Sequence, residues 1–382
     1  MAQDGTLKVG AMMRLAAAIL AAWLQVANPY EAGIKALDEG RYAEAEQHFQ
    51  KAVAAEPGDY AGWFHLALAQ SLLNKDEEAV SSYKKVLELK PGLYEAELNL
   101  GIVLLRAGKA AEAAPLLSHA RDQKPAEPRP NFFLAEALAA AGELQKAEPF
   151  YRAAAEADPS LKDGLLKLAE AFEKKGEREQ AIRLYAEFPD NVAARERAGA
   201  LLLEADQPQQ AIAHLEYAVA HSPSAANRAA LALAYQRTKQ MEKAEAQWRQ
   251  AVAMAPDDAD LRLRYGRFLR DEKKYAAAAA EFQRVVSARP GSVEAWNELA
   301  GVLILLESYP QALAALDRVQ QMGGETPGHV YLRAIMLDKL GQAKLALEQY
   351  RRFLDQSNGK FPDEEFKARQ RVRILEREAG RR

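Results

Sequence analysis

One phrase recurs along this chain at a nearly constant spacing. Ten alanines mark it, about 34 residues apart with one shorter step in the middle: Ala45, Ala79, Ala113, Ala147, Ala181, Ala211, Ala244, Ala278, Ala312 and Ala346. A bulky side chain follows each alanine four residues later, as Phe49 follows Ala45, and a proline follows most of them after twelve. Such self-similarity indicates a solenoid, because each unit buries its apolar face only by stacking on its neighbours.

Each unit of the repeat is expected to contain two helices. The first has apolar residues at helical spacing, such as Trp63 and Leu66, and a turn residue such as Gly108 ends it. In the second helix, the alanine and the bulky residue share one face because they lie four residues apart. Proline then ends the second helix, because it has no N–H for the hydrogen-bond ladder. Ten such units span residues 26–360.

This pattern resembles the tetratricopeptide repeat family, whose motif is Trp-x2-Leu-Gly-x2-Tyr followed by Ala, Phe, Ala and Pro. The best match comprises Trp63, Leu66, Ala67, Ala79, Tyr83, Val86 and Pro91, and a second comprises Trp296, Leu299, Ala300, Ala312 and Leu316. The resemblance implies an all-α, right-handed superhelical solenoid of about ten helix-turn-helix repeats. It also implies a non-catalytic role in binding proteins or peptides on a concave surface lined by the first helices.

The repeat is interrupted once, in its fifth unit. That unit is shorter than the others, and Pro189 falls where its second helix should still be running. We therefore expect a truncated helix and a kink, with repeats 1–5 in residues 28–192 and repeats 6–10 in residues 193–360. Pro115 and Pro149 lie early in second helices, where they need not break them. Residues 361–382 are expected to form a polar capping helix.

The first 27 residues differ in character from the repeats. Lys8 and Arg14 precede about a dozen mostly apolar residues, which is the length of a signal-peptide core and too short for a comfortable membrane span. We interpret the segment as an export signal, which would place the protein in the periplasm or outside the cell. A helix packing on the first repeat of a cytoplasmic protein and a retained membrane anchor are the alternatives. The absence of cysteine assigns no compartment.

The sequence offers no recognisable catalytic or cofactor chemistry. It contains no phosphate-binding glycine loop, no nucleophile elbow and no zinc-protease motif, and Ser81 and Lys84 match a Ser-x-x-Lys string without its companion motifs. The six histidines show no metal-ligand clustering, and the net charge of −3 gives no basic field for nucleic acid. We therefore expect no enzyme, no cofactor and no nucleic-acid partner.

A partner-binding surface can be predicted from the repeat register. In units one to four, the groove-facing places of the first helices carry mainly apolar residues: Tyr30, Ile34, Leu37, Phe64, Leu68, Leu72, Leu98, Ile102, Leu105 and Phe132. In units five to eight these places are mostly charged, for example Glu170, Glu196 and Arg267. An apolar trough of this extent would bind an apolar segment of a protein or peptide. Packing between helices and occupation by the chain's own N-terminal segment are the alternatives.

One kind of partner is not expected at this trough. Within the resembling family, a partner's C-terminal carboxylate is held by Lys, Asn and Arg at matching places of three successive units, whereas here Phe64 and Leu68 occupy such places. The sequence thus predicts a non-catalytic scaffold or adaptor in complex assembly. The alternatives are a self-associating structural protein of the cell envelope and a subunit that presents substrates to an enzyme.

Overall fold

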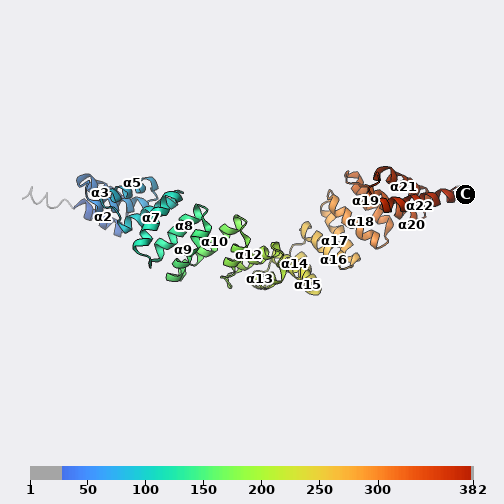
Figure 1. Cartoon of the computed structure of the whole chain (residues 1–382), viewed down its shortest axis with the longest axis horizontal. Coiled ribbons are helices and arrows are strands. Elements are labelled where there is room, and N and C mark those ends of the chain that lie inside the picture. Colours follow the sequence, from blue (N-terminus) through green and yellow to red (C-terminus); the bar gives the residue numbers. More distant parts are fainter. Residues whose placement is uncertain (1–27, 380–382) are drawn as a thin grey trace, which may run out of the picture. The chain divides into compact units, whose positions relative to one another are not determined.

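The computed structural model describes residues 28–379, and every regular element in this range is a helix. The chain divides into two compact units, residues 1–187 and residues 188–382. Figure 1 shows the order of the helices along the chain. We describe each unit by itself.

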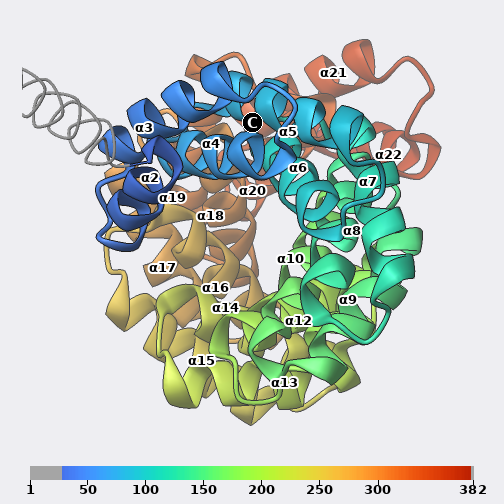
Figure 2. The same cartoon turned by 90° about the vertical axis from the view of Figure 1, so that its left-hand side faces the viewer.

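The N-terminal unit consists of paired antiparallel helices. They are α2 (Pro29–Asp38), α3 (Tyr42–Ala55), α4 (Tyr60–Leu72), α5 (Asp76–Leu89), α6 (Tyr94–Arg106), α7 (Ala110–Gln123), α8 (Pro128–Ala140), α9 (Leu144–Ala157), the 3-10 turn η1 (Pro159–Leu161), α10 (Asp163–Lys174) and α11 (Arg178–Tyr185). Within this unit, α4, α6 and α8 lie on the inner side and α5, α7 and α9 on the outer side (Figure 2). Contacts join α2 to α4, α4 to α6, and α6 to α8.

The C-terminal unit continues the same pairing. Its helices are α12 (Val192–Glu204), α13 (Pro208–His221), α14 (Ala225–Arg237), α15 (Met241–Met254), α16 (Ala259–Asp271), α17 (Tyr275–Ala288), α18 (Val293–Leu305), α19 (Tyr309–Gln321), α20 (Pro327–Lys339), α21 (Ala343–Ser357) and α22 (Pro362–Ala379). Each first helix packs on its second helix, and each second helix packs on the first helix of the next pair.

The repeated alanines and bulky residues form the core between these helices. All ten alanines of the series have an exposed fraction of 0%. The bulky residues that follow them are buried as well, from Phe49 at 0% to Tyr350 at 5%. The alanine lets a neighbouring helix approach closely, and the bulky side chain fills the space that remains. The predicted helical repeat is therefore confirmed.

Two expectations about prolines are also confirmed. Helix α11 has eight residues, whereas α9 has fourteen, so the second helix of the fifth unit is truncated ahead of Pro189. Helices α7 and α9 run through Pro115 and Pro149 without interruption. Each proline is the sixth residue of its helix, so it removes a single backbone hydrogen bond near the start and leaves the later turns intact.

Most pairs are joined by a tight turn in the left-handed conformation. Gly108 adopts φ +74° between α6 and α7, where glycine carries no steric penalty. Asn74 takes the same role between α4 and α5 at φ +59°, and Lys239 does so between α14 and α15 at φ +63°. The turn geometry is thus kept across both units while the residue that adopts it changes.

Candidate partner-binding surfaces

Nine of the ten residues predicted to face a partner keep part of their surface exposed. We call them the N-terminal apolar surface: Tyr30, Ile34 and Leu37 of α2, Phe64, Leu68 and Leu72 of α4, Ile102 and Leu105 of α6, and Phe132 of α8. Leu72 is the most open of them with an exposed fraction of 44%, and the other eight are half-buried. They lie on successive first helices, which contact one another directly.

Leu98, the tenth predicted residue, lies in the core and offers no surface to a partner. Its exposed fraction is 4%, and it belongs to a buried cluster with Leu100 and Leu117. Phe64 and Ile102 pack against the same cluster from outside. Leu98 has the same place in its repeat as Phe64, but the leucine side chain is shorter and its neighbours cover it. For Leu98, the alternative of core packing is therefore correct.

Aromatic contacts fix the N-terminal end of this surface. The Tyr30 hydroxyl lies 3.1 Å from Nδ1 of His65, and the two rings meet edge to face with centroids 5.4 Å apart. Phe64 packs edge to face on the buried ring of Tyr83 at 5.8 Å. Burial raises the pKa of the Tyr83 hydroxyl well above its ordinary value, so the hydroxyl stays neutral. These rings are held in place by the core beneath them, so the surface is preorganised.

The other end of the surface is bounded by charge. Phe132 packs edge to face on Tyr151 at 5.7 Å, and the ammonium of Lys167 lies 5.6 Å from the Phe132 ring centroid. Lys167 also pairs with Glu136 at 3.3 Å. The apolar character therefore ends at α8, where the first charged residues appear among the inner side chains.

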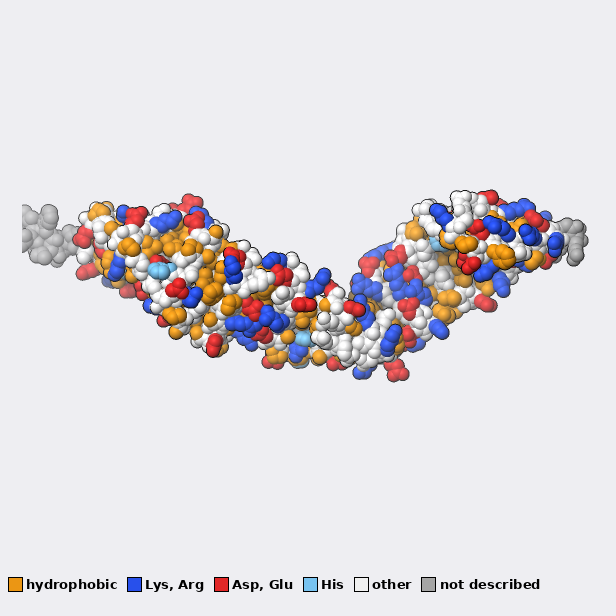
Figure 3. Space-filling view, in the orientation of Figure 1, with side chains coloured by type: hydrophobic (Ala, Val, Ile, Leu, Met, Phe, Trp, Pro, Cys, Tyr) orange, Lys and Arg blue, Asp and Glu red, His pale blue; other side chains and the backbone are white. Residues whose placement is uncertain are grey.

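Hydrophobic side chains gather on the N-terminal unit, and Lys and Arg side chains gather around α16 and α17 in the C-terminal unit (Figure 3).

Two cavities of the N-terminal unit lie away from the predicted surface, one of about 570 Å³ beside Leu87 and Leu116 and one of about 600 Å³ beside Trp63 and Ser81. Neither cavity is lined by a residue of the N-terminal apolar surface.

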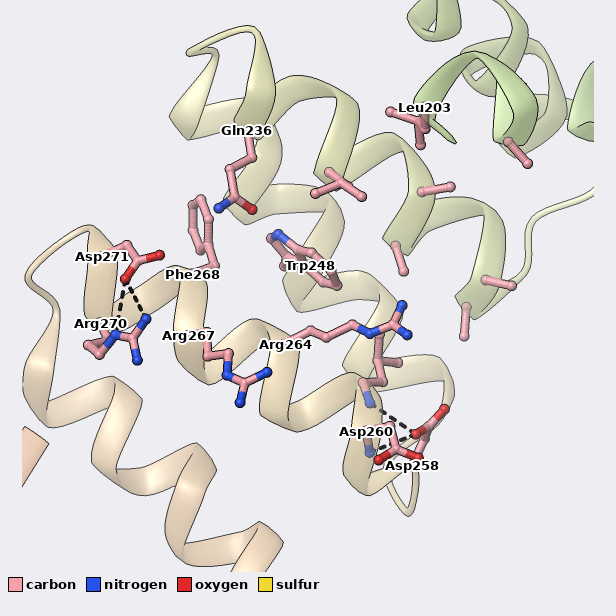
Figure 4. A pocket seen from close by; sticks show the side chains of 17 residues that line it. Leu203, Gln236, Trp248, Asp258, Asp260, Arg264, Arg267, Phe268, Arg270 and Asp271 are labelled. Atoms are coloured by element: carbon pink, nitrogen blue, oxygen red, sulfur yellow. Dashed lines mark hydrogen bonds and ion pairs between the residues drawn. The ribbon is translucent and has the colours of Figure 1, made fainter. Parts of the chain in front are cut away.

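The inner side of the C-terminal unit is hollow instead. A cavity of about 790 Å³ opens over α12, α14 and α16, and we call it the α14 hollow (Figure 4). Small side chains form its floor: Ala200, Ala226, Ala229 and Ala230. Phe268 and the indole of Trp248 also line it, and Gln236 and Arg264 are polar residues at its wall.

An ion-pair network borders the α14 hollow along α16. Arg267 contacts Glu298 at 2.6 Å and Glu294 at 2.5 Å, and Arg270 pairs with Glu298 and with Asp271. The hydrogen bonds that Arg267 donates to Glu294 and Glu298 raise the pKa of Arg267 above its ordinary value. These arginines already have acidic partners, so their charge is largely compensated within the unit.

Sequence reasoning did not find the α14 hollow, although a signal for it exists. Ala200 stands eleven residues before Ala211, the place that Leu68 occupies before Ala79. Where units one to three carry Ile34, Leu68 and Ile102, unit six carries alanine. Comparing the size of side chains at one register place, and not only their polarity, would have predicted the hollow.

Within residues 28–379, no helix is long and apolar enough to cross a lipid bilayer. In the same range, no group of three or more His, Asp or Glu residues is arranged to hold a metal ion. The predicted export segment, residues 1–27, lies outside the described residues.

Comparison with protein-family models establishes the class to which this chain belongs. A model described as tetratricopeptide repeat matches residues 30–94, 98–161 and 229–293, and two further models of the same description match residues 269–334 and 163–192. The matches of the first model alone cover about half of the chain, so the chain belongs to the tetratricopeptide repeat family. No curated protein matches the sequence.

Solved structures with a similar fold include several tetratricopeptide repeat proteins. The C-terminal part of a repeat protein from Cytophaga hutchinsonii has 15% identity and a TM-score of 0.48, with 62% of this chain and 99% of that chain covered. A repeat protein from Parabacteroides merdae has 18% identity and a TM-score of 0.39, with coverage of 59% and 91%. YrrB, described as a TPR protein with an unusual peptide-binding site, has 20% identity and a TM-score of 0.39, with coverage of 50% and 97%. Similarity at these levels concerns the repeat fold alone.

Proposed function

We propose that this protein is a non-catalytic adaptor that binds an apolar segment of a protein partner on its N-terminal apolar surface. The observation that carries the proposal is the row of large apolar side chains left half-buried or exposed on α2, α4, α6 and α8. A contiguous apolar surface on a folded chain is typical of a protein-interaction site. By joining such a partner to others, the adaptor would assist the assembly of a complex.

The chemistry of this surface selects the partner. Phe64, Leu68 and Ile102 offer contact area and no hydrogen-bond donors for a carboxylate. We therefore expect an apolar segment to bind, presented as a helix or an extended strand. An acidic C-terminal tail or a nucleic acid would find neither the arginines nor the lysines that it needs there.

The test is affinity capture from the source cell with two variants of the full chain. The surface variant Leu68→Glu/Leu72→Glu/Ile102→Glu adds charge to half-buried or exposed positions and spares the core residue Leu98. The matched control Ser81→Glu/Leu89→Glu adds charge to exposed positions of the outer helix α5. We expect a protein that the wild type and the control retain and the surface variant loses, while all three keep the same helicity. Equal capture by all three would refute the proposal.

A second candidate function is self-association, and one observation favours it. Phe366 and Ile374 of α22 have exposed fractions of 64% and 42%, which is high for large apolar side chains on a terminal helix. A structural protein of the cell envelope could assemble through this face without a separate client. Light scattering over a range of protein concentrations distinguishes the two functions, because only self-association raises the mass as concentration rises.

We also propose that residues 1–27 direct export, on the evidence of their composition alone. The expected result is a periplasmic or secreted protein whose N-terminus begins after this segment when it is isolated from its own cell. Isolation of the chain from the cytoplasm with Met1 or Ala2 at its N-terminus would contradict export.

A further inference from the structure

The α14 hollow has properties that the N-terminal apolar surface lacks. In its floor, Ala200 stands at the register place of Leu68 and Ala229 at that of Phe64, and its volume of about 790 Å³ lies in the range of ligand pockets. A partner with a large apolar side chain could insert that side chain into the hollow, because none of the residues 28–379 fills the space. The floor alone does not define a ligand, but the polar groups around it do.

Three polar groups at the hollow have no partner in the described part of the chain. The indole N–H of Trp248 makes no hydrogen bond although the residue is only 3% exposed. Figure 4 shows this nitrogen on the edge of the ring that faces Gln236 and Phe268. A buried unpaired donor is uncommon in folded proteins and often marks a place where a further group binds. The side-chain amide of Gln236 is likewise free of any hydrogen bond to residues 28–379.

Arg264 is the third of these groups and the only α16 arginine at the hollow without an ion pair among the described residues. Arg267 and Arg270 are both paired with Glu298. Asp258 caps the start of α16, and Asp260 pairs with Arg289 at 2.6 Å, which lowers the pKa of the Asp260 carboxyl. The positive charge of Arg264 also lowers the pKa of the Asp260 carboxyl, but Asp260 forms its ion pair with Arg289. The guanidinium of Arg264 is exposed at the wall of the hollow.

We propose that the α14 hollow binds a segment of a protein partner that combines one large apolar side chain with one acidic side chain nearby. The apolar side chain fills the space over Ala200, Ala229 and Ala230. The carboxylate pairs with Arg264, in the bidentate geometry that guanidinium groups favour. Gln236 donates to and accepts from the backbone of the segment, and the indole N–H of Trp248 donates to a backbone carbonyl of the segment.

This site goes beyond the proposed function, because it lies in the other unit and calls for a different ligand. None of the nine residues of the N-terminal apolar surface is a cation, and Lys167 at its edge is paired with Glu136, whereas the α14 hollow combines an apolar floor with an arginine that has no ion pair among the described residues. Experiments can therefore disprove binding at one of the two sites without disproving binding at the other.

The test begins with random dodecapeptides displayed on phage and selected on the full chain. We expect enrichment of peptides that carry Phe, Trp or Leu together with Asp or Glu. Selected peptides, synthesised with a fluorescent label, are then titrated by anisotropy against three variants. Ala200→Leu/Ala230→Leu fills the hollow with two larger side chains. The fold should tolerate them, because other repeats have leucine at the equivalent places, Leu68 for Ala200 and Leu332 for Ala230. Arg264→Ala removes the free cation, and Arg284→Ala removes an exposed arginine of the outer helix α17 as a matched control.

The hollow-filling variant and Arg264→Ala should each weaken peptide binding by about tenfold or more, and Arg284→Ala should leave it unchanged. Exchange of the peptide's Asp or Glu for Asn or Gln should weaken binding to the wild type and have little effect on binding to Arg264→Ala. Enrichment of no peptide, enrichment without acidic residues, or full affinity for the filled variant would overturn the proposal. Loss of binding in Leu68→Glu/Leu72→Glu/Ile102→Glu alone would place the peptides on the N-terminal apolar surface, which overturns this proposal and supports the proposed function.

Discussion

The side chain of His329 makes the start of α20 sensitive to pH. It stands in the first turn of α20, where its backbone N–H donates to the Thr326 hydroxyl at 3.4 Å and its Nδ1 accepts from the Thr326 N–H at 3.2 Å. This reciprocal pair is a capping box. Burial lowers the pKa of His329 below its ordinary value of 6.5, which outweighs the opposing effect of Glu325. Protonation would also remove the acceptor that Thr326 uses.

A lowered pKa predicts that stability falls in mild acid. Above about pH 6.5 both the folded and the unfolded states keep His329 neutral, whereas below it the unfolded state takes up the proton first. His329→Gln keeps a side-chain acceptor and does not titrate, so we expect a smaller fall of the thermal midpoint between about pH 7.5 and pH 5. The pKa of His214 is lowered in the same direction by burial and by Arg195, so some pH dependence should remain. An unchanged pH dependence in the variant would contradict this role of His329.

Residue-level exposure was the least predictable property of the sequence. The repeat register placed Phe64 and Leu98 at equivalent sites, yet one is half-buried and the other is 4% exposed. Exposure depends on the lengths of the neighbouring side chains on three helices, which the period of a single chain does not encode. Polarity at a register place was therefore predictable, and accessibility was not.

At the scale of elements, the close packing of helix pairs depends on glycines facing bulky residues. A Cβ atom built on Gly101 of α6 would lie 2.5 Å from Cγ of the fully buried Leu117 in α7. The same conflict would occur between Gly266 and Phe282 in the C-terminal unit. Gly301 of α18 differs, because a Cβ atom there would meet open space.

The two kinds of glycine predict opposite effects of the same substitution. Gly101→Ala should destabilise the protein by about 1–3 kcal/mol, because the core around Leu117 is filled. Gly301→Ala should stabilise it by about 0.5–1 kcal/mol, because alanine favours the helix and nothing obstructs its methyl group. Thermal unfolding followed by circular dichroism checks both. A loss of stability in Gly301→Ala would mean that its surroundings are more crowded than the structure indicates.

The pairing of helices was predictable from the sequence, whereas the α14 hollow was not. The alanine and bulky residue of each second helix fix the packing, and their period is visible by inspection. The hollow exists because Ala200 and Ala230 are smaller than the side chains at the equivalent places of other repeats. This difference can be seen in the sequence only when side-chain sizes are compared at equivalent places of the repeats.

At the scale of the whole molecule, α22 closes the last repeat. Ala368 and Leu375 of α22 are buried against Val330 and Phe353. Arg371 pairs with Asp338 of α20, with its Nη2 atom 2.7 Å from the carboxylate. A solenoid needs such a covered end, because its last helix pair otherwise exposes the face on which a further repeat would stack.

Deletion of residues 362–382 should therefore expose the apolar face of α21. We expect a lower thermal midpoint and a mass that rises with protein concentration in light scattering, because the uncovered face would associate with itself. Deletion of residues 380–382 alone provides the control and should change neither quantity. A shortened chain that stays monomeric with an unchanged midpoint would show that α22 is not needed as a cap.

The central claim is that the N-terminal apolar surface binds an apolar segment of a partner, and calorimetric titration of the captured partner into the full chain tests it most directly. The account predicts a negative heat-capacity change on binding, as burial of apolar surface requires. It further predicts that Leu68→Glu/Leu72→Glu/Ile102→Glu weakens affinity by about a hundredfold or more, while Ser81→Glu/Leu89→Glu binds like the wild type. Equal affinities for the three proteins, or a heat-capacity change near zero, would contradict the claim.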